Sequence, residues 1–253
     1  MFDAVVLAGG GKPEPLTVQE RVSNKAFIKL HGKPLLGYIL ESLVEASSVD
    51  CIVVIGPEEE LKILQQSGYV FLSVPEKGTM LDNLAAGFEA VKEDRLCLVV
   101  TGDIPLLTAA VIEDFVERCA PFDHDFYYPI LTRECCSRRF PETERTYVHL
   151  KEGEITGGNI GLLRPDWFLK NRSQLEIFIS SRKKPLRLLR MLSFSLIIKY
   201  IFRKLAVSDL EDFFSRLLNL RVRAVVCEHV EIGTDVDKIS DLAAVRRALQ
   251  NKP

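Results

Sequence analysis

The chain lacks several features that mark well-known protein classes. Its six cysteines include no C-x-x-C pair and four of them lie in apolar segments, so we expect buried thiols in a reducing compartment rather than a zinc site. The formal net charge is −2, so no overall basic field argues for nucleic-acid binding. No basic stretch followed by an apolar one opens the sequence, which predicts a cytoplasmic protein without a secretory signal.

A transmembrane helix is also not expected. The leucine-rich segment Leu186–Ala206 has too many basic residues to span a bilayer, namely Arg187, Arg190, Lys199, Arg203 and Lys204. It lies within a stretch, Asp166–Leu220, where leucine and aromatic residues recur at helical spacing, which predicts roughly three helices. Three interpretations stay open: a buried helical hairpin, a homodimer face, or a basic amphipathic helix on a membrane or a lipid-like acceptor.

The composition is that of an ordinary globular protein, with 47% hydrophobic and 27% charged residues in a chain of 253. Short apolar runs alternate with helical patterns along it. The runs that predict strands are 4–7, 51–55, 69–74, 96–100, 125–131, 158–163 and 221–227, with a hairpin at 147–156. The patterns that predict helices are 34–46, 58–66, 81–91 and 108–119, with a last helix ending near Leu249.

This alternation predicts an α/β fold. We expect a Rossmann-like three-layer α/β/α sandwich with a mostly parallel, twisted sheet and right-handed crossovers. Residues 1–253 would form a single domain, and residues 166–220 would be a helical insertion in its last third.

The strongest local signal is at the start of the chain. The apolar run Ala4–Leu7 ends in Ala8-Gly9-Gly10-Gly11, which predicts a buried strand that opens into a tight loop. Contiguous glycines let the backbone turn sharply and present its N–H groups to an anion. Lys12 and Lys25 add positive charge, and Lys33-Pro34 opens a helix. Together these features outline a phosphate site at the carboxyl end of a sheet.

A second signal follows the run at 96–100, where the sequence continues Thr101-Gly102-Asp103-Ile104-Pro105. A carboxylate at the carboxyl end of a central parallel strand lies at the ligand-binding edge of such a sheet. Gly102 would let a phosphate or a metal ion approach closely. Taken alone, Asp103 could equally form a turn before Pro105. Beside the glycine loop, the ligand-site interpretation is favoured.

Three further places have two interpretations each. Gly78 and Thr79 either cap the following helix or contact a nucleotide, since their loop leaves the same sheet edge as the glycine loop. The basic cluster that includes Arg145 is either a solvated loop or a site for an acceptor phosphate. Gly158, one of two adjacent glycines ahead of Asn159, indicates close approach by another backbone or by a ligand.

These segments together resemble the MobA-like nucleotidyltransferase family of molybdenum-cofactor and sugar-nucleotide synthesis. The matching parts are Leu7–Gly10, Asn24-Lys25, Gly32–Leu35 and Gly102–Pro105. The family has an arginine after its glycines, and here Lys12 and Arg21 are the two candidates for that role. The resemblance covers residues 1–164 and 221–250, and the helical insertion lies outside it.

The resemblance implies an activity and a set of site residues. NMP would pass from an NTP, with CTP or GTP favoured, to a small and phosphorylated or hydroxylated acceptor, releasing pyrophosphate. Lys25 and Asp103 would be catalytic, and Asp103 would share a Mg²⁺ ion with Asp237 and Asp235. Nucleotide contacts would come from Leu7, Ala8, Gly9, Gly10, Gly11, Lys12, Lys25, Gly78, Thr79 and Asp103. Acceptor contacts would come from Gly158, Asn159 and Arg145.

Two other functions are compatible with parts of the sequence. A nucleotide-binding regulatory protein without catalysis would explain the departures from the family pattern at Gly11–Glu14 and at Lys238-Ile239. A dehydrogenase domain that binds NAD(P) is disfavoured, because the glycines are contiguous rather than spaced as G-x-G-x-x-G. No acidic residue ends the second expected strand either.

Overall fold

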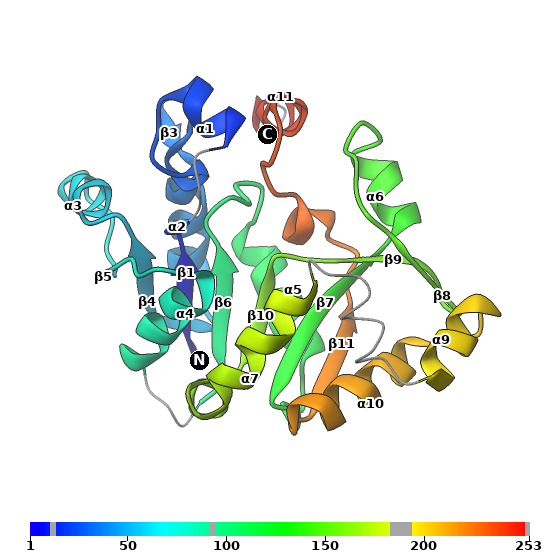
Figure 1. The fold of residues 1–253 in the computed structure, drawn as a ribbon. Coiled ribbons are helices and arrows are strands. Elements are labelled where there is room, and N and C mark those ends of the chain that lie inside the picture. The colour runs from blue at the N-terminus through cyan, green and yellow to red at the C-terminus, as the bar shows by residue number, and fades with distance from the viewer. Residues whose placement is uncertain (11–13, 92–94, 183–193, 251–253) are drawn as a thin grey trace.

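The computed structural model describes residues 1–10, 14–91, 95–182 and 194–250. In this part of the chain a nine-stranded sheet has helices on both faces (Figure 1). Its strands are β1 (Phe2–Leu7), β4 (Val49–Gly56), β5 (Leu72–Pro75), β6 (Cys97–Thr101), β7 (Phe126–Thr132), β8 (Val148–Leu150), β9 (Gly153–Gly157), β10 (Ile160–Leu163) and β11 (Val222–Val226). A separate small hairpin consists of β2 (Lys29–Leu30) and β3 (Lys33–Pro34).

The helices before β10 are α1 (Pro15–Glu20), η1 (Lys25–Phe27), α2 (Leu35–Glu45), α3 (Glu58–Gln66), α4 (Met80–Glu89), α5 (Ala109–Arg118) and α6 (Arg133–Arg139). Those after β10 are α7 (Pro165–Arg182), α9 (Phe194–Ile201), α10 (Val207–Leu218), η2 (Val230–Gly233) and α11 (Ile239–Gln250). Among the described residues, none of these helices is both long and apolar enough to span a membrane.

The sheet has the order β5-β4-β1-β6-β10-β7-β9-β8, and β11 also pairs with β7. β1 is parallel to both β4 and β6, and β11 is parallel to β7. β10 is antiparallel to both of its neighbours, β6 and β7. The expected α/β sandwich with a mostly parallel core is therefore confirmed. Two strands are reversed, β10 near the centre and β9, which is antiparallel to β7 and β8.

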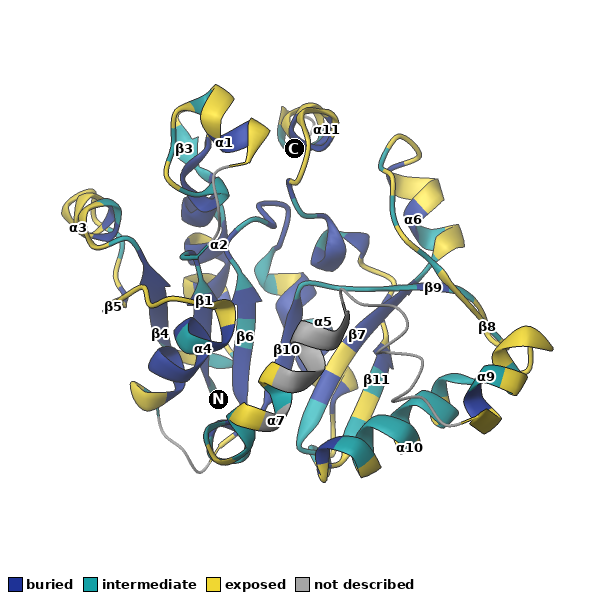
Figure 2. Cartoon of the chain, viewed as in Figure 1, coloured by how far each residue is buried: buried dark blue, intermediate teal, exposed yellow. Residues whose placement is uncertain are grey.

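The two layers of helices follow from the alternation of side chains along β1. Ala4 and Val6 belong to a large apolar core with residues of α2, α5 and α11. Val5 points to the other face and packs with α4 and α7. On that face the rings of Phe88 and Phe168 meet edge to face, with centroids 5.1 Å apart. Residues of the central strands β1 and β4 are largely buried, whereas the helices on either side have exposed outer faces (Figure 2).

Several local expectations are confirmed and others are wrong. Thr79 is the N-cap of α4, one of the two interpretations of its sequence, and Thr108 is the N-cap of α5, whose helix is expected at 108–119. The chain after the glycine loop contains α1, which begins at Pro15 and is not predicted. The basic cluster that includes Arg145 begins within α6, a helix that the sequence analysis does not predict and that starts because the Thr132 hydroxyl accepts a hydrogen bond from Cys135 N–H. The expected strand at 69–74 begins only at Leu72.

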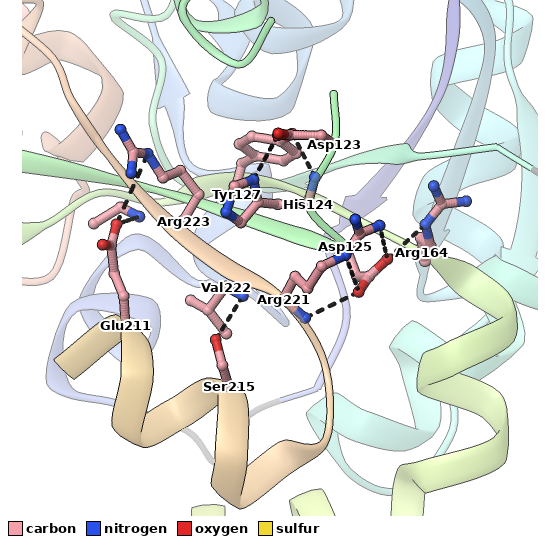
Figure 3. A network of polar contacts seen from close by, with 11 residues as sticks. Asp123, His124, Asp125, Tyr127, Arg164, Glu211, Ser215, Arg221, Val222 and Arg223 are labelled. Carbon is pink, nitrogen blue, oxygen red and sulfur yellow. Dashed lines mark hydrogen bonds and ion pairs between the residues drawn. The ribbon is translucent and has the colours of Figure 1, made fainter. Parts of the chain in front are cut away.

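The stretch between β10 and β11 contains α7, α9 and α10. Residues 183–193, the first part of the leucine-rich segment, lie outside the described residues. α10 is attached to strand β11 by side chains that satisfy backbone N–H groups of that strand (Figure 3). Ser215 Oγ accepts from Val222 N at 2.9 Å, and Glu211 Oε1 accepts from Ala224 N at 2.7 Å.

The packing of α4 on the sheet leads to a stability prediction for Gly87. A Cβ at this position would lie 2.6 Å from Val5 Cγ1 and 2.7 Å from Ile55 Cδ1. We expect Gly87→Ala to lower the free energy of unfolding by about 1–3 kcal/mol, although alanine is the better helix former. Urea denaturation would measure this, with Glu89→Ala on the exposed face of the same helix as the control. A stabilised Gly87→Ala variant would contradict this description of the packing.

Candidate functional site

The glycine loop lies between the carboxyl ends of β4 and β6. Ala8 N donates to Ile55 O at 2.8 Å, and Gly102 N donates to Leu7 O at 2.9 Å. Gly9 has no room for a side chain, because a Cβ would lie 2.6 Å from Glu76 Oε2 and 3.0 Å from Gly56 Cα. Gly10 has φ of +80°, which favours glycine. Gly11 and Lys12 lie outside the described residues.

Two residues next to the glycine loop received little weight in the sequence analysis. The carboxylate of Glu76 accepts a hydrogen bond from Gly10 N at 2.6 Å, so a side-chain anion occupies this N–H of the loop. Asn83 is fully buried and accepts from Lys77 N through Oδ1, but its Nδ2 has no partner among the described residues. Both residues lie close in the sequence to the Gly78-Thr79 pair. This is the one sequence signal that could have identified them as site residues.

Four of the expected site residues come together at the carboxyl end of β6. Asp103 follows β6, Lys25 opens η1, and Asp235 and Asp237 follow η2. Carboxylate oxygens of the three aspartates lie within 4.8 Å of one another. Lys25 Nζ lies 3.3 Å from Asp103 Oδ2 and also contacts Asp237 Oδ1. We call Asp103, Asp235 and Asp237 the carboxylate cluster.

The local backbone explains why these segments meet. Val236 N donates to the carbonyl oxygen of Asp103 at 3.0 Å, which joins the turn after η2 to the end of β6. On the other side, Asn24 accepts from Ala26 N through its side chain and caps η1. The Asn24 amide also donates to Gly10 O at 2.9 Å. Lys25 is thereby fixed between the glycine loop and the carboxylate cluster.

The charges of the site act strongly on one another. Burial, together with the nearby charges of Asp103 and Asp237, raises the pKa of Asp235 to about 6. Burial opposes the charged form of Lys25, yet the carboxylates of Asp103, Asp237 and Glu14 outweigh it and raise the pKa of that ammonium. Lys25 is therefore a cation that balances part of the negative charge of the cluster.

The cluster also has the chemistry of a magnesium site. Mg²⁺ prefers a few carboxylate oxygens together with water and phosphate oxygens. Asp103 Oδ1 is buried without a hydrogen-bond partner among the described residues, which is a costly state for a carboxylate oxygen unless a ligand meets it. The donor set and this unpaired oxygen both fit a divalent cation.

The residues expected on the acceptor side lie at the same sheet edge. Asn159 N donates to Ile232 O at 2.8 Å, and Thr101 N donates to Asn159 O at 3.1 Å, so Asn159 is held between β6 and η2. A Cβ on Gly158 would lie 3.2 Å from Ile232 O, which is the close backbone approach that its sequence indicates. Both residues are thus neighbours of the turn that carries the carboxylate cluster.

Arg145 reaches the cluster through that turn. Its guanidinium donates to Gly233 O and, at 2.7 Å, to Thr234 Oγ1, while Nε is buried without a partner among the described residues. These bonds fix the backbone immediately before Asp235. Thr79 caps α4 reciprocally with Asp82, and Gly78 is exposed beside it. Arg21 is exposed at the end of α1.

Comparison with known proteins identifies the family of this chain. Residues 4–165 match the model of the MobA-like NTP transferase domain. The chain belongs to this family.

Curated relatives match a little under half of this chain. A probable molybdenum cofactor guanylyltransferase of Thermococcus kodakarensis is 33% identical over 118 residues, covering 47% of this chain and 53% of the relative. A 3-deoxy-manno-octulosonate cytidylyltransferase of Hydrogenovibrio crunogenus is 26% identical over 116 residues, covering 44% and 47%. The chain thus spans about half the length of the curated relatives it matches.

One solved structure is similar over nearly the whole chain. A protein described as a hypothetical transferase from Thermus thermophilus is 34% identical with a TM-score of 0.82, covering 95% of this chain and 99% of its own. A CMP-2-keto-3-deoxy-manno-octonic acid synthetase solved with CTP has a TM-score of 0.62 at 15% identity, and shares the fold.

The raised pKa of Asp235 predicts how a substitution changes stability. The pKa of this carboxyl in the folded protein, about 6, is above its ordinary value of 3.8. The charged form therefore weakens folding at neutral pH, and this cost disappears as the pH falls below the ordinary value. In metal-free protein at pH 8, we expect Asp235→Asn to raise the free energy of unfolding by about 1–3 kcal/mol.

Urea denaturation with a chelator present would test this at pH 8 and pH 4, with the exposed Asp50→Asn as the control. The two proteins should converge at pH 4. An Asp235→Asn variant less stable than the parent at pH 8 would show that the Asp235 charge is stabilising.

Proposed function

We propose that this protein is a Mg²⁺-dependent nucleotidyltransferase that moves NMP from an NTP to a phosphorylated small molecule and releases pyrophosphate. The observation that carries the proposal is the convergence of Asp103, Asp235, Asp237 and Lys25 beside the glycine loop. The family membership and the transferase names of the relatives support it. Those names favour CTP or GTP as the donor.

Each part of the site has a distinct task in this proposal. Backbone N–H groups of the glycine loop bind the NTP phosphates, as anions are bound at such loops. Glu76 must then leave Gly10 N, which makes that N–H available. Asp103, Asp235 and Asp237 would hold Mg²⁺, which neutralises phosphate charge when bound. Lys25 would turn from the aspartates to the α-phosphate, where negative charge develops in the transition state.

The reaction needs positioning and charge neutralisation more than covalent help. An acceptor oxygen forms a bond to the α-phosphorus, and the bond from that phosphorus to the bridging oxygen breaks. Pyrophosphate leaves with the electron pair of the broken bond.

The nature of the acceptor follows from the lack of a histidine base. His124, His149 and His229 pair with Asp123, Glu154 and Asp114, which are outside the carboxylate cluster, and His31 lies between β2 and β3. A hydroxyl acceptor would need a base to remove its proton, whereas a phosphate dianion has no proton to lose. With the aspartates assigned to Mg²⁺ and Lys25 to the α-phosphate, no group of the site is left as that base, and we propose a phosphate monoester as acceptor, next to Gly158 and Asn159.

The role of Asp103 can be tested by turnover. We expect Asp103→Asn to lower Mg²⁺-dependent turnover by at least ~100-fold while the fold stays intact, because it removes one preorganised charge contact. A pyrophosphate-release assay over four NTPs and a panel of phosphate monoesters would measure this, with Asp123→Asn, on an exposed loop residue, as the control. Near-normal turnover by the Asp103→Asn variant would show that Asp103 is not a catalytic residue. Nucleotide binding without turnover in the parent protein would favour the non-catalytic regulatory alternative.

Lys25 should affect catalysis and metal binding in opposite directions. We expect Lys25→Ala to lower kcat more than it raises KM, because the ammonium meets charge that develops in the transition state. Without nucleotide, the same variant should bind Mn²⁺ at least roughly tenfold more tightly, since it lacks a cation that competes for Asp103 and Asp237.

Electron paramagnetic resonance of Mn²⁺ would give the affinities. Lys238→Ala is the matched control, because this ammonium pairs with Glu144 at 2.7 Å rather than with the carboxylate cluster. Weaker Mn²⁺ binding by Lys25→Ala would mean that Lys25 arranges the carboxylates for the metal instead of competing with it.

A further inference from the structure

A groove with an almost entirely apolar lining lies between the sheet and the helices that follow β10. Its volume is about 450 Å³, and its walls include Phe126 and Tyr128 of β7, Ile155 of β9, Leu210 and Phe214 of α10, and Ala224 of β11. Protein interiors are packed with few voids larger than a water molecule. A groove of this size and composition therefore falls in the range of small-molecule binding sites.

The walls of the groove are held by specific bonds. β11 pairs with β7 on one side only, and its other backbone N–H groups bond to Ser215 and Glu211 of α10 (Figure 3). Asp125, at the start of β7, accepts from Arg221 N at 2.9 Å and from Arg164 Nε at 2.9 Å. These bonds join α10, β11 and the end of β10 around the groove, so its shape is built into the fold.

One end of the groove reaches the acceptor edge of the site. Thr156 and Gly157 line it, and Gly158 and Asn159 follow directly in the chain. A Cβ on Gly233, two residues before Asp235, would lie 3.3 Å from Gly157 O. Thr146 also lines the groove, next to Arg145 with its buried and unpaired Nε among the described residues. The apolar space thus ends where a phosphate group would meet the turn that carries the cluster.

The opposite end has exposed apolar residues. Leu150 and Val207 line this end, and Lys151 N donates to Leu205 O at 2.7 Å, which attaches the chain after α9 to the β8–β9 hairpin. Phe194 at the start of α9 is 76% exposed, and Phe202 just after it is 68% exposed. These two phenylalanines do not line the groove, whereas Leu150 and Val207 are half-buried within it.

We propose that this groove holds the hydrocarbon chain of the acceptor, and that the acceptor is a single-chain alkyl phosphate. This inference rests on the proposed nucleotidyltransferase function. The chain would lie along α10, and the phosphate would reach the Gly157–Asn159 end. A phosphate oxygen of the acceptor forms the bond to the α-phosphorus of the NTP while pyrophosphate leaves with the electron pair of the broken bond. The dianionic phosphate brings no proton, and nothing is oxidised or reduced.

Direct binding tests this without turnover. Calorimetry of the full chain with dodecyl phosphate, below its micellar concentration, should show saturable binding with one site per chain. Octyl phosphate should bind at least about tenfold more weakly, because each buried methylene contributes roughly fourfold to affinity. Inorganic phosphate should not bind with comparable affinity, which distinguishes chain recognition from phosphate recognition alone.

Two variants that fill the groove make the test specific. Ala224→Phe and Leu210→Trp should each weaken dodecyl phosphate binding at least about tenfold, because they occupy the space of several methylenes. Val226→Phe is the matched control on β11, since Val226 is 55% exposed and lies outside the lining. All three should bind NTP with Mg²⁺ as the parent does.

The outcomes separate this inference from the proposed function. No binding of dodecyl phosphate by the parent overturns the inference and leaves the nucleotidyltransferase proposal standing. Equal affinity for octyl and dodecyl phosphate, or unchanged affinity in a folded Ala224→Phe or Leu210→Trp, also overturns it. If the parent protein shows no Mg²⁺-dependent binding of NTP, the proposed function is overturned instead.

Discussion

The mutual repulsion of three aspartates is the physical constraint on which the candidate site depends. Carboxylates within 4.8 Å of one another are stable only when a cation or protons offset their charge. In the metal-free chain Lys25 does so for Asp103 and Asp237, while burial, together with the charges of these two aspartates, raises the pKa of Asp235. The site therefore has a standing deficit of positive charge, which a divalent cation delivered with a nucleotide would remove.

The sheet explains how these charges are brought together at all. β1 and β6 are adjacent and parallel, so the glycine loop and Asp103 leave the sheet side by side. β10 runs in the opposite direction next to β6 and begins at that same edge, which places Asn159 beside Thr101. The chain then returns along β11 and delivers Asp235 and Asp237 from η2. A reversed strand near the centre of the sheet thus puts the residues expected on the donor side and on the acceptor side at one edge.

Much of this arrangement could be predicted from the sequence, and the rest depends on contacts between distant segments. Apolar runs that stop at glycines marked β1 and β4, and threonines before helical patterns marked the starts of α4 and α5. The direction of β10 was not predictable, because a run of apolar residues has no preferred direction in a sheet. α6 was missed since only Cys136 is buried in it. Nothing in the sequence pattern distinguishes Glu76 from other loop residues. Its bond to Gly10 N forms because β5 ends next to the glycine loop. The meeting of Asp103 with Asp237 was indicated by family resemblance alone.

The path of the chain also sets the order in which the site can form during synthesis. The glycine loop, Lys25 and Asp103 are made early, and the parallel strands that carry them can pair as soon as they leave the ribosome. Asp235 and Asp237 come after β11, which docks on β7 only when the helices between them have been made. Until then the nascent chain has one carboxylate and no complete cluster. A growing polypeptide would therefore assemble the whole cluster only after every strand of the described sheet has been translated.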